Sequence, residues 1–516
     1  MVKKAVWISA LASALALVTS ANGLASVSKP TAISGPSPVV ECAGAFDAGQ
    51  IGRNYPNAEV EPQVSVSGDN IIAMYHQDRW SSGGGHGIGV NYSKNAGATW
   101  GETMLPINRC TSTDPSLSFY LRASDPWVSF GPDGTAYASA LVFNLGVPNW
   151  DNAVAVATST DGATWQHAQA IKGSAFTQFA QSTDKNATTA DPKKAGYAYT
   201  VWDTLIEPTD NPNDNPHTSS YTGPAYFSKT KDGGVSWSEA KIIIDTKQRQ
   251  QTIGNIIVVD PTNGDLYDFT DLIVSPNTPR QGTRSDALLA FVKSTNGGDT
   301  WTAPQVIAPF NSLGVVDPND TTKRLRVGDG LEEVAIDSSG KIYVVWESST
   351  NYQKQLKQSS GAWDDEILMT TSSSGGASWT TPIVVHQASG KPTYTPTVAV
   401  NGNRVAVTYY DNRNLQPGQT KVLPTDYWVS ISTDGGAFEE QPITTKSFDQ
   451  LSAPFARGFF LGDYEGLQPS GTGFTALFVK TNCEQPYTDT SCGPASSTLT
   501  PTPNKNPTDV FIATVS

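Results

Sequence analysis

Apolar and polar residues alternate along most of the chain in short runs that turn residues separate. Alternation with a period of two over four to eight residues indicates half-buried β-strands. Long amphipathic helical patterns are absent from the sequence. Seven segments read as a strand, a turn rich in Gly or Asp, and a second strand. They cover residues 61–79, 124–141, 184–203, 254–271, 331–348, 394–413 and 462–481.

A second pattern lies between these segments, and its clearest copy is the octet Ser-Thr-Asn-Gly-Gly-Asp-Thr-Trp from Ser294 to Trp301. Ser, Thr, Asp and Asn side chains bond turn backbone groups, Gly supplies positive φ, and the closing aromatic ring packs under the turn. We call this octet a hairpin lock, and its Asp residues are expected to be structural. The six locks are Ser93–Trp100, Ser159–Trp165, Thr230–Trp237, Ser294–Trp301, Ser372–Trp379 and Ser432–Phe438.

The spacing of the locks predicts a repeat architecture. Their closing aromatic residues are 65, 72, 64, 78 and 59 residues apart. This period is too long for a solenoid turn and suits a four-stranded antiparallel blade of a β-propeller with decorated loops. Seven strand pairs against six locks favour seven blades over six. The last blade, after Gly462, has one further strand in residues 508–515, so we expect a strand near residues 38–42 to close the ring and remove its exposed edge.

Composition agrees with an all-β protein, because Gly (45) and Pro (34) are frequent and only 16% of residues are charged. The formal charge of -14 argues against binding to nucleic acid or anionic membranes. Lys3 and Lys4 precede a short apolar run with small residues at Ala21 and Ala25, which predicts a signal peptide and secretion. The predicted organisation is a signal peptide (1–25), an N-terminal segment that could close the last blade (26–56) and a single propeller domain (57–516).

Four cysteines in a secreted chain allow three disulfide pairings. Cys483 and Cys492 bracket an eight-residue loop and would form a local clip. Cys42 would then tie the N-terminal segment to Cys110. Five scattered histidines do not form a zinc motif.

The hairpin lock resembles the Asp-box, also called the BNR repeat, of the sialidase (neuraminidase) superfamily. The resemblance runs from Ser93 to Phe438 and implies a sialidase-like β-propeller. For sialidases it further implies three arginines that bind the sugar carboxylate, a Tyr nucleophile with a Glu partner, and an Asp acid/base. Sialidases begin the inner strand of their first blade with an Arg-Ile-Pro-like tripeptide. This chain departs from that pattern, because the corresponding strand begins Glu61-Pro62-Gln63.

Topology predicts where a ligand would bind. If each lock joins the third and fourth strands, the opposite face collects the starts of the first strands and the ends of the second strands, and loops on that face form the ligand surface. Strand alternation lets only one of Glu332 and Glu333 point toward the axis. The substrate-binding candidates on this face are Arg79, Trp80, His86, Arg122, Arg326, Arg413, Arg457 and Asp463.

The catalytic candidates lie on the same face. Tyr464 is the first choice of nucleophile, with Tyr410 second, and Glu332 is the candidate Glu partner. Asp78 or Asp125 would serve as acid/base, because crowded carboxylates separate their pKa values.

The favoured function is a secreted, sialidase-like exo-glycosidase, acting as a monomer on terminal acidic sugars of extracellular glycans. Arg122, Arg326 and Arg457 would bind the sugar carboxylate, with Arg79 or Arg413 as substitutes. One alternative is a lyase or hydrolase for uronic-acid polysaccharides, in which Tyr464 and His86 would transfer protons. The other is a non-catalytic propeller that binds glycans or proteins. No cofactor is expected to be required, although the acidic rim could hold structural Ca²⁺.

Overall fold

The computed structural model describes residues 25–42, 47, 49–146, 150–209, 221–274, 286–349, 365–388, 390–488, 492 and 507–516. Most of the predicted signal peptide, residues 1–24, lies outside the described residues. In the part of the chain that is described, the secondary structure is β-strand apart from one short 3₁₀ turn, η1 (Gln450–Ser452). These same residues contain no helix long and apolar enough to cross a membrane.

Within the described residues, strand pairing forms seven groups of four antiparallel strands, which we call blades 1 to 7 in chain order. The parallel pairing of the short β12 (Thr222–Gly223) with β15 joins blades 3 and 4 into one larger sheet. Blade 1 is β2 (Val60–Ser67), β3 (Asn70–Gln77), β4 (Gly87–Ser93) and β5 (Gly101–Met104); blade 2 is β6 (Arg122–Phe130), β7 (Ala136–Phe143), β8 (Asn152–Ser159) and β9 (Gln166–Ala170); blade 3 is β10 (Gln181–Ala190), β11 (Ala198–Ile206), β13 (Ala225–Thr230) and β14 (Lys241–Ile244); blade 4 is β15 (Gln250–Val259), β16 (Leu266–Val274), β17 (Asp286–Ser294) and β18 (Gln305–Pro309).

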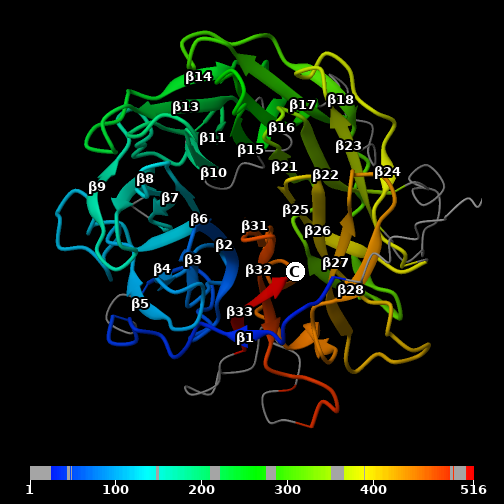
Figure 1. The fold of residues 1–516 in the computed structure, drawn as a ribbon. Helices are drawn as coiled ribbons and strands as arrows, with labels where there is room; N and C mark the ends of the chain where they lie inside the picture. The colour runs from blue at the N-terminus through cyan, green and yellow to red at the C-terminus, as the bar shows by residue number, and fades with distance from the viewer. Residues whose placement is uncertain are drawn as a thin grey trace, which may run out of the picture.

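The remaining blades follow the same order, and the first strand of each blade contacts the first strand of the next, from β2 through β31 and back to β2. The blades therefore surround a common axis (Figure 1). The predicted all-β class and four-stranded antiparallel blades are confirmed. Blade 5 is β21 (Glu332–Ile336), β22 (Ile342–Ser348), β23 (Glu366–Ser372) and β24 (Ile383–Val384); blade 6 is β25 (Thr393–Asn401), β26 (Arg404–Asp411), β27 (Pro424–Ser432) and β28 (Glu439–Pro442); blade 7 is β31 (Gly466–Ser470), β32 (Gly473–Thr481), β33 (Thr508–Val515) and β1 (Thr31–Ala32); short extra strands are β19 (Val316–Asp317), β20 (Asp320–Arg326), β29 (Phe448–Asp449) and β30 (Phe459–Phe460).

Blade 7 takes its fourth strand from the N-terminal segment, as Thr31 pairs with Ile512 and Ala32 with Phe511. In Figure 1 the blue β1 lies beside the red β33. The pairing residues are not those expected, because residues 38–42 form a turn in which the Cys42 N–H donates to the Val39 carbonyl. Pro38 also lacks the N–H that a ladder needs.

Each hairpin lock joins the third and fourth strands of its blade, as the sequence predicts. In the lock of blade 4, Ser294 Oγ accepts a hydrogen bond from the Gly298 N–H at 2.9 Å, and Asn296 Oδ1 accepts one from the Thr300 N–H at 2.9 Å. The closing ring of Trp301 packs edge-on against Phe227 of blade 3. The lock therefore stabilises its own turn and the interface with the preceding blade.

The inner strands, which are the first strands of the blades, share a feature that the alternation of apolar and polar residues does not reveal. Five of them contain a β-bulge near the start, at a residue with positive φ that is followed by Pro or Asn. A bulge inserts one extra residue and re-aims the side chain next to it. The positive-φ residues are Glu61, Asp125, Lys185, Gly254 and Thr395, with φ values of 54°, 50°, 40°, 74° and 52°.

The backbone N–H groups of three of these bulges are satisfied by the preceding blade. The Asp125 N–H donates to His76 Nε2 at 2.7 Å, and the Thr395 N–H donates to Glu347 Oε1 at 2.7 Å. The Gly254 N–H similarly donates to Asp203 Oδ1 at 3.3 Å. The polar residues at second-strand ends therefore include side chains that hold neighbouring blades together.

Candidate functional site

The bulges of blades 1 to 3 bring three charged side chains together at one end of the axis. Lys185 Nζ donates to Asp125 Oδ1 at 2.9 Å and lies 3.3 Å from Glu61 Oε1. It also donates to Asp463 Oδ2 at 2.7 Å, which brings in the segment that precedes β31 of blade 7. Burial lowers the pKa of Lys185, but the carboxylates of Asp125, Asp463 and Glu61 outweigh it and raise that pKa well above its usual value. Lys185 is therefore a permanent cation.

A second cation joins this cluster from β20. Arg326 Nε donates to Asp463 Oδ1 at 2.9 Å, and its Nη2 bonds Asp463 Oδ2, so the contact is bidentate. Burial raises the pKa of Asp463, but Arg326 and Lys185 outweigh it and leave that pKa below its usual value. Arg326 also lies over the ring of Phe460 at 4.3 Å, and Arg79 lies over the same ring at 4.8 Å.

Arg79 and His76 complete the buried part of the cluster. Arg79 is 2% exposed, and its Nη1 donates to the Gly84 carbonyl at 3.2 Å. Burial lowers the pKa of Arg79 to about 10, so the guanidinium stays charged at neutral pH. His76 Nε2 lies 2.8 Å from Glu61 Oε2. Burial raises the pKa of Glu61, but neighbouring positive charge, of which Lys185 contributes most, outweighs it and holds that pKa well below its usual value.

A pocket, which we call the mouth pocket, opens above this cluster. Its floor contains charged side chains, and one wall is formed by Phe143, Leu145, Trp150 and Phe179, all of which are partly exposed. Trp150 and Phe179 pack edge to face with their ring centroids 4.7 Å apart. We call these four residues the aromatic wall. The charged floor consists of Glu61, Arg79, Asp125, Asp184, Lys185, Arg326 and Arg457.

Asp184 is the acid of the charged floor best placed for proton transfer. Its side chain is exposed to solvent where it lines the pocket. Desolvation and the nearby Asp125 carboxylate raise the pKa of Asp184 to about 6. Asp184 and Glu61 therefore have pKa values on opposite sides of the usual carboxyl range, which is the arrangement that assigns an acid and a permanent carboxylate.

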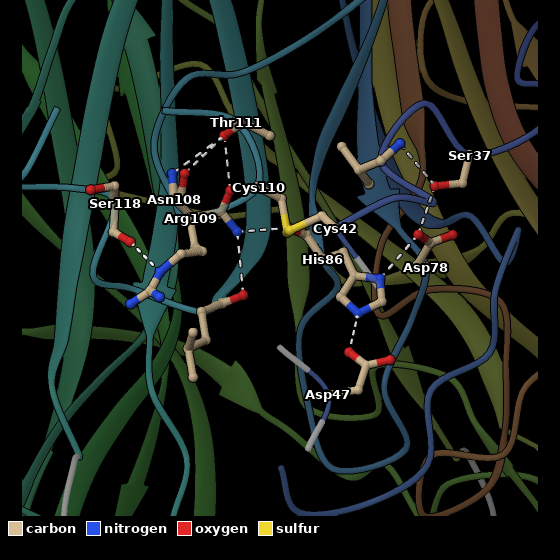
Figure 2. The surroundings of a disulfide bond; sticks show 12 residues. Ser37, Cys42, Asp47, Asp78, His86, Asn108, Arg109, Cys110, Thr111 and Ser118 are labelled. Carbon is tan, nitrogen blue, oxygen red and sulfur yellow. Dashed lines mark hydrogen bonds and ion pairs between the residues drawn. A yellow bond between two sulfur atoms is a disulfide. The ribbon is translucent and has the colours of Figure 1, made fainter. Parts of the chain in front are cut away.

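The loop from His76 to Gly87 contributes less to the pocket than its sequence suggests. His86 Nε2 lies 2.8 Å from Asp47 Oδ1 and its Nδ1 lies 3.1 Å from Asp78 Oδ2 (Figure 2). Ser37 Oγ also donates to Asp78 Oδ2 at 2.7 Å. Burial lowers the pKa of His86, but Asp78 and Asp47 outweigh it and raise that pKa. Asp78 and His86 thus hold the N-terminal segment to blade 1.

Both expected disulfides are present, since Cys42 bonds Cys110 and Cys483 bonds Cys492. The first joins the N-terminal segment to the loop between β5 and β6, close to His86 (Figure 2). Covalent and ionic contacts therefore fix the same segment.

The predicted arginines do not all reach the pocket. Arg122 is buried, and its guanidinium donates to the carbonyls of Gly83 and Ile51 at 2.9 Å and 2.7 Å while stacking on Trp80 at 4.3 Å. Arg413 pairs with Glu440 at 2.9 Å and with Asp411 in blade 6. Arg79, Arg326 and Arg457 line the pocket together, and Arg457 is exposed.

The two tyrosine candidates are buried. Tyr464 is 6% exposed and lines a separate axial cavity below the cluster, with its hydroxyl 3.5 Å from the Pro126 carbonyl. Burial and the Asp125, Glu61 and Asp463 carboxylates raise the pKa of Tyr464 well above its usual value. The Tyr410 hydroxyl lies 2.6 Å from the Val479 carbonyl oxygen and 2.8 Å from Glu465 Oε1 inside the core. Neither hydroxyl is exposed to the pocket.

The remaining catalytic candidate, Glu332, is 1% exposed. Burial and the nearby Asp271 raise the pKa of Glu332 well above its usual value, which favours a neutral carboxyl. Its neighbour Glu333 lines the axial cavity that contains Tyr464 and also a second cavity between the inner strands. Burial raises the pKa of Glu333 to about 8.

The residues best arranged for a metal ion are already engaged. Ligand atoms of Glu61, His76 and Asp125 lie within 4.8 Å of one another. However, Lys185 Nζ contacts the two carboxylates, and the Asp125 N–H donates to His76 Nε2. A cation would have to displace the lysine amine, so the donor set does not fit the structural Ca²⁺ considered from the sequence.

Glu61, His76, Asp184 and Lys185 lie on the face that the sequence predicts for the ligand, but they are not among the residues selected there as site candidates. The alternation rule fails at a bulge, because the extra residue shifts the side chains that follow it. A usable signal is present, namely a charged or small residue before Pro or Asn near the start of an inner strand. It recurs as Glu61-Pro62, Asp125-Pro126, Lys185-Asn186, Gly254-Asn255 and Thr395-Pro396.

No family model matches the chain, and comparison with curated proteins finds no match. Similar solved structures include a protein of unknown function from Dyadobacter fermentans, with 13% identity over 81% of this chain and 97% of that chain and a TM-score of 0.44. A Hadza microbial sialidase is 13% identical over 79% of this chain and 70% of its own, with a TM-score of 0.42. The α-L-arabinanase of Penicillium chrysogenum, solved with arabinobiose, is 12% identical over 74% of this chain and 94% of its own, with a TM-score of 0.43. The strand pairing of the chain itself defines its fold as a β-propeller of four-stranded antiparallel blades.

Proposed function

We propose that the protein is a secreted exo-glycosidase that removes a terminal acidic sugar from extracellular glycans. The observation that carries the proposal is the mouth pocket, in which three arginines line the same cavity as an acid of raised pKa and a permanently ionised carboxylate. Arginine binds carboxylates, and two carboxyl groups with separated pKa values are the machinery of glycoside hydrolysis.

The roles follow from charge and exposure. Arg457 is exposed in the pocket and is free of the Arg326–Asp463 pairing, so Arg457 and Arg79 would bind the sugar carboxylate. Asp184, with a pKa of about 6, would donate a proton to the leaving oxygen. Glu61 would remain ionised and stabilise the positive charge that develops on the sugar ring.

A glycosidase for neutral sugars is the second candidate. It is favoured by the engagement of Arg326 with Asp463 and of Lys185 with three carboxylates, which leaves fewer uncompensated positive charges for an anionic ligand. The lyase alternative has less support, because His86 bonds Asp47 and Asp78 while Tyr464 lines a different cavity.

A panel of 4-methylumbelliferyl glycosides tests the proposal, with N-acetylneuraminic acid, glucuronic acid and α-L-arabinofuranose as terminal sugars. We expect turnover of an acidic glycoside that falls at least about 100-fold in Asp184→Asn and in Glu61→Gln. Turnover restricted to neutral glycosides would establish the second candidate. Ultraviolet absorbance from an unsaturated product would indicate a lyase, and glycan binding without turnover would indicate a non-catalytic module.

A further inference from the structure

The mouth pocket has two chemically different sides. The charged floor is formed by bulges of the inner strands, by Arg326 of β20 and by Arg79 and Arg457 from loops. The aromatic wall comes from the end of β7, the segment after it and the segment before β10, so it belongs to blades 2 and 3. All four residues of the wall are partly exposed, although side chains of these types are usually buried. Exposed aromatic rings that line a pocket indicate a ligand with an apolar face.

The three aromatic rings of the wall pack against other protein atoms before any ligand binds. Trp150 and Phe179 meet edge to face at 79° with centroids 4.7 Å apart, so each restricts the other. Phe143 is fixed from a different direction, because its ring lies where a side chain on Gly84 would have to be. A pre-organised aromatic surface loses little conformational entropy on binding.

The extent of the mouth pocket bears on the length of the ligand. Its lining runs from the charged floor, which includes Glu61 and Arg326, to the aromatic wall, so a ligand that contacts both sides must span them. Sugar rings combine hydroxyl edges with an apolar C–H face. A glycan chain could therefore place its terminal residue on the charged floor and the apolar face of its next residue on the aromatic wall.

We infer that the aromatic wall binds the second sugar residue of the substrate, so that the protein acts on glycan chains of at least two residues in preference to isolated terminal sugars. This inference rests on the proposed function, since the terminal sugar at the charged floor fixes where the next residue lies. Trp150 and Phe179 are then specificity-determining residues that contact the sugar beside the cleaved bond.

A binding experiment with the Asp184→Asn variant tests the inference independently of turnover. The probe is an array of immobilised glycans that carry the same terminal sugar on chains of one, two and three residues. We expect affinity to rise about tenfold from one residue to two, because a well-packed aromatic anchor is worth more than about 1 kcal/mol. In Asp184→Asn combined with Trp150→Ala or Phe179→Ala, this rise should disappear while binding of the single residue is retained.

The matched control is Tyr197→Ala, which removes a partly exposed ring from the turn between β10 and β11, away from the pocket lining. Its affinity profile should equal that of Asp184→Asn alone. If the rise with chain length survives both wall substitutions, the inference is wrong while the glycan function stands. If no glycan of any length binds, both the proposed function and the inference are wrong.

Discussion

Lys185 Nζ and Asp463 Oδ2 lie 2.7 Å apart, which links blade 3 to the segment leading into blade 7 across the axis of the propeller. The same amine contacts carboxylates from blades 1 and 2, so one side chain joins four blades. It is positioned by a bulge in β10 and by a backbone with φ of 40°, a conformation that is costly for a residue other than Gly. The charge of Lys185 compensates that cost by neutralising buried acids.

Replacing Lys185 with Met should destabilise the protein by about 3–5 kcal/mol, because removing one partner leaves buried carboxylates uncompensated. Urea denaturation followed by tryptophan fluorescence measures the change. Lys172→Met is the control, since Lys172 forms an exposed pair with Glu239 and its loss should cost less than about 1 kcal/mol. Equal stability of the two variants would show that the cluster does not hold the blades together.

Asp184 predicts the pH dependence of turnover. If Asp184 donates the proton, kcat/KM should fall as pH rises through about 6, because the carboxyl loses its proton above that value. In Asp184→Asn, the residual activity should no longer change in this range. A wild-type profile that is flat between about pH 5 and pH 7 would remove Asp184 from the mechanism.

Much of the fold could be predicted from the sequence, because the features that specify it are local. The lock from Ser294 to Trp301 carries its own hydrogen-bonding groups and positive-φ glycines, and period-two alternation is read directly. The closing strand was misplaced, because Thr31–Ala32 is too short to produce alternation. Asp78 and His86 were selected as site candidates although they bind the N-terminal segment, because nothing in the sequence shows that contact.

The central cluster was harder to predict, because its members are assembled by bulges and by contacts between distant blades. Lys185 and Asp463 are 278 residues apart, and neither has a local signature of ion pairing. The sequence does predict that ligand-binding residues lie near the starts of the inner strands. Which side chain faces the axis depended on a single extra residue that period-two counting does not register.

Glu59 predicts how stability depends on pH. It is fully buried beside Asp509 and Asp78, and burial together with these acids raises the pKa of Glu59 well above its usual value. The folded state therefore keeps its proton at pH values where the unfolded chain has released it, so the free energy of unfolding falls as pH rises above the usual pKa of Glu. Unfolding midpoints in urea between about pH 5 and pH 8 should decrease for the wild type.

The Glu59→Gln variant should be more stable than the wild type at the upper end of that range and should show a shallower decrease. The amide keeps an acceptor for Gln77, whose Nε2 donates to Glu59 Oε1 at 2.6 Å. Glu239→Gln, which changes an exposed carboxylate, should leave the wild-type slope unchanged. A steeper slope in Glu59→Gln would contradict the assignment.

Substitutions at two adjacent glycines in the lock of blade 4 allow the stability effect of turn strain to be measured separately from that of packing between blades. Gly297 and Gly298 have φ values of 66° and 83°, so a Cβ at either position costs about 1–2 kcal/mol of backbone strain. A Cβ at Gly297 would meet nothing within 4 Å, whereas one at Gly298 would lie 2.3 Å from Phe227 Cζ in blade 3. Gly297→Ala should therefore show the strain alone, and Gly298→Ala should lose about 1–3 kcal/mol more of unfolding free energy through overpacking.

Adding Phe227→Leu should recover part of the stability lost in Gly298→Ala and none of that lost in Gly297→Ala. Equal losses in the two single variants, measured by urea denaturation, would mean that the lock stabilises only its own hairpin.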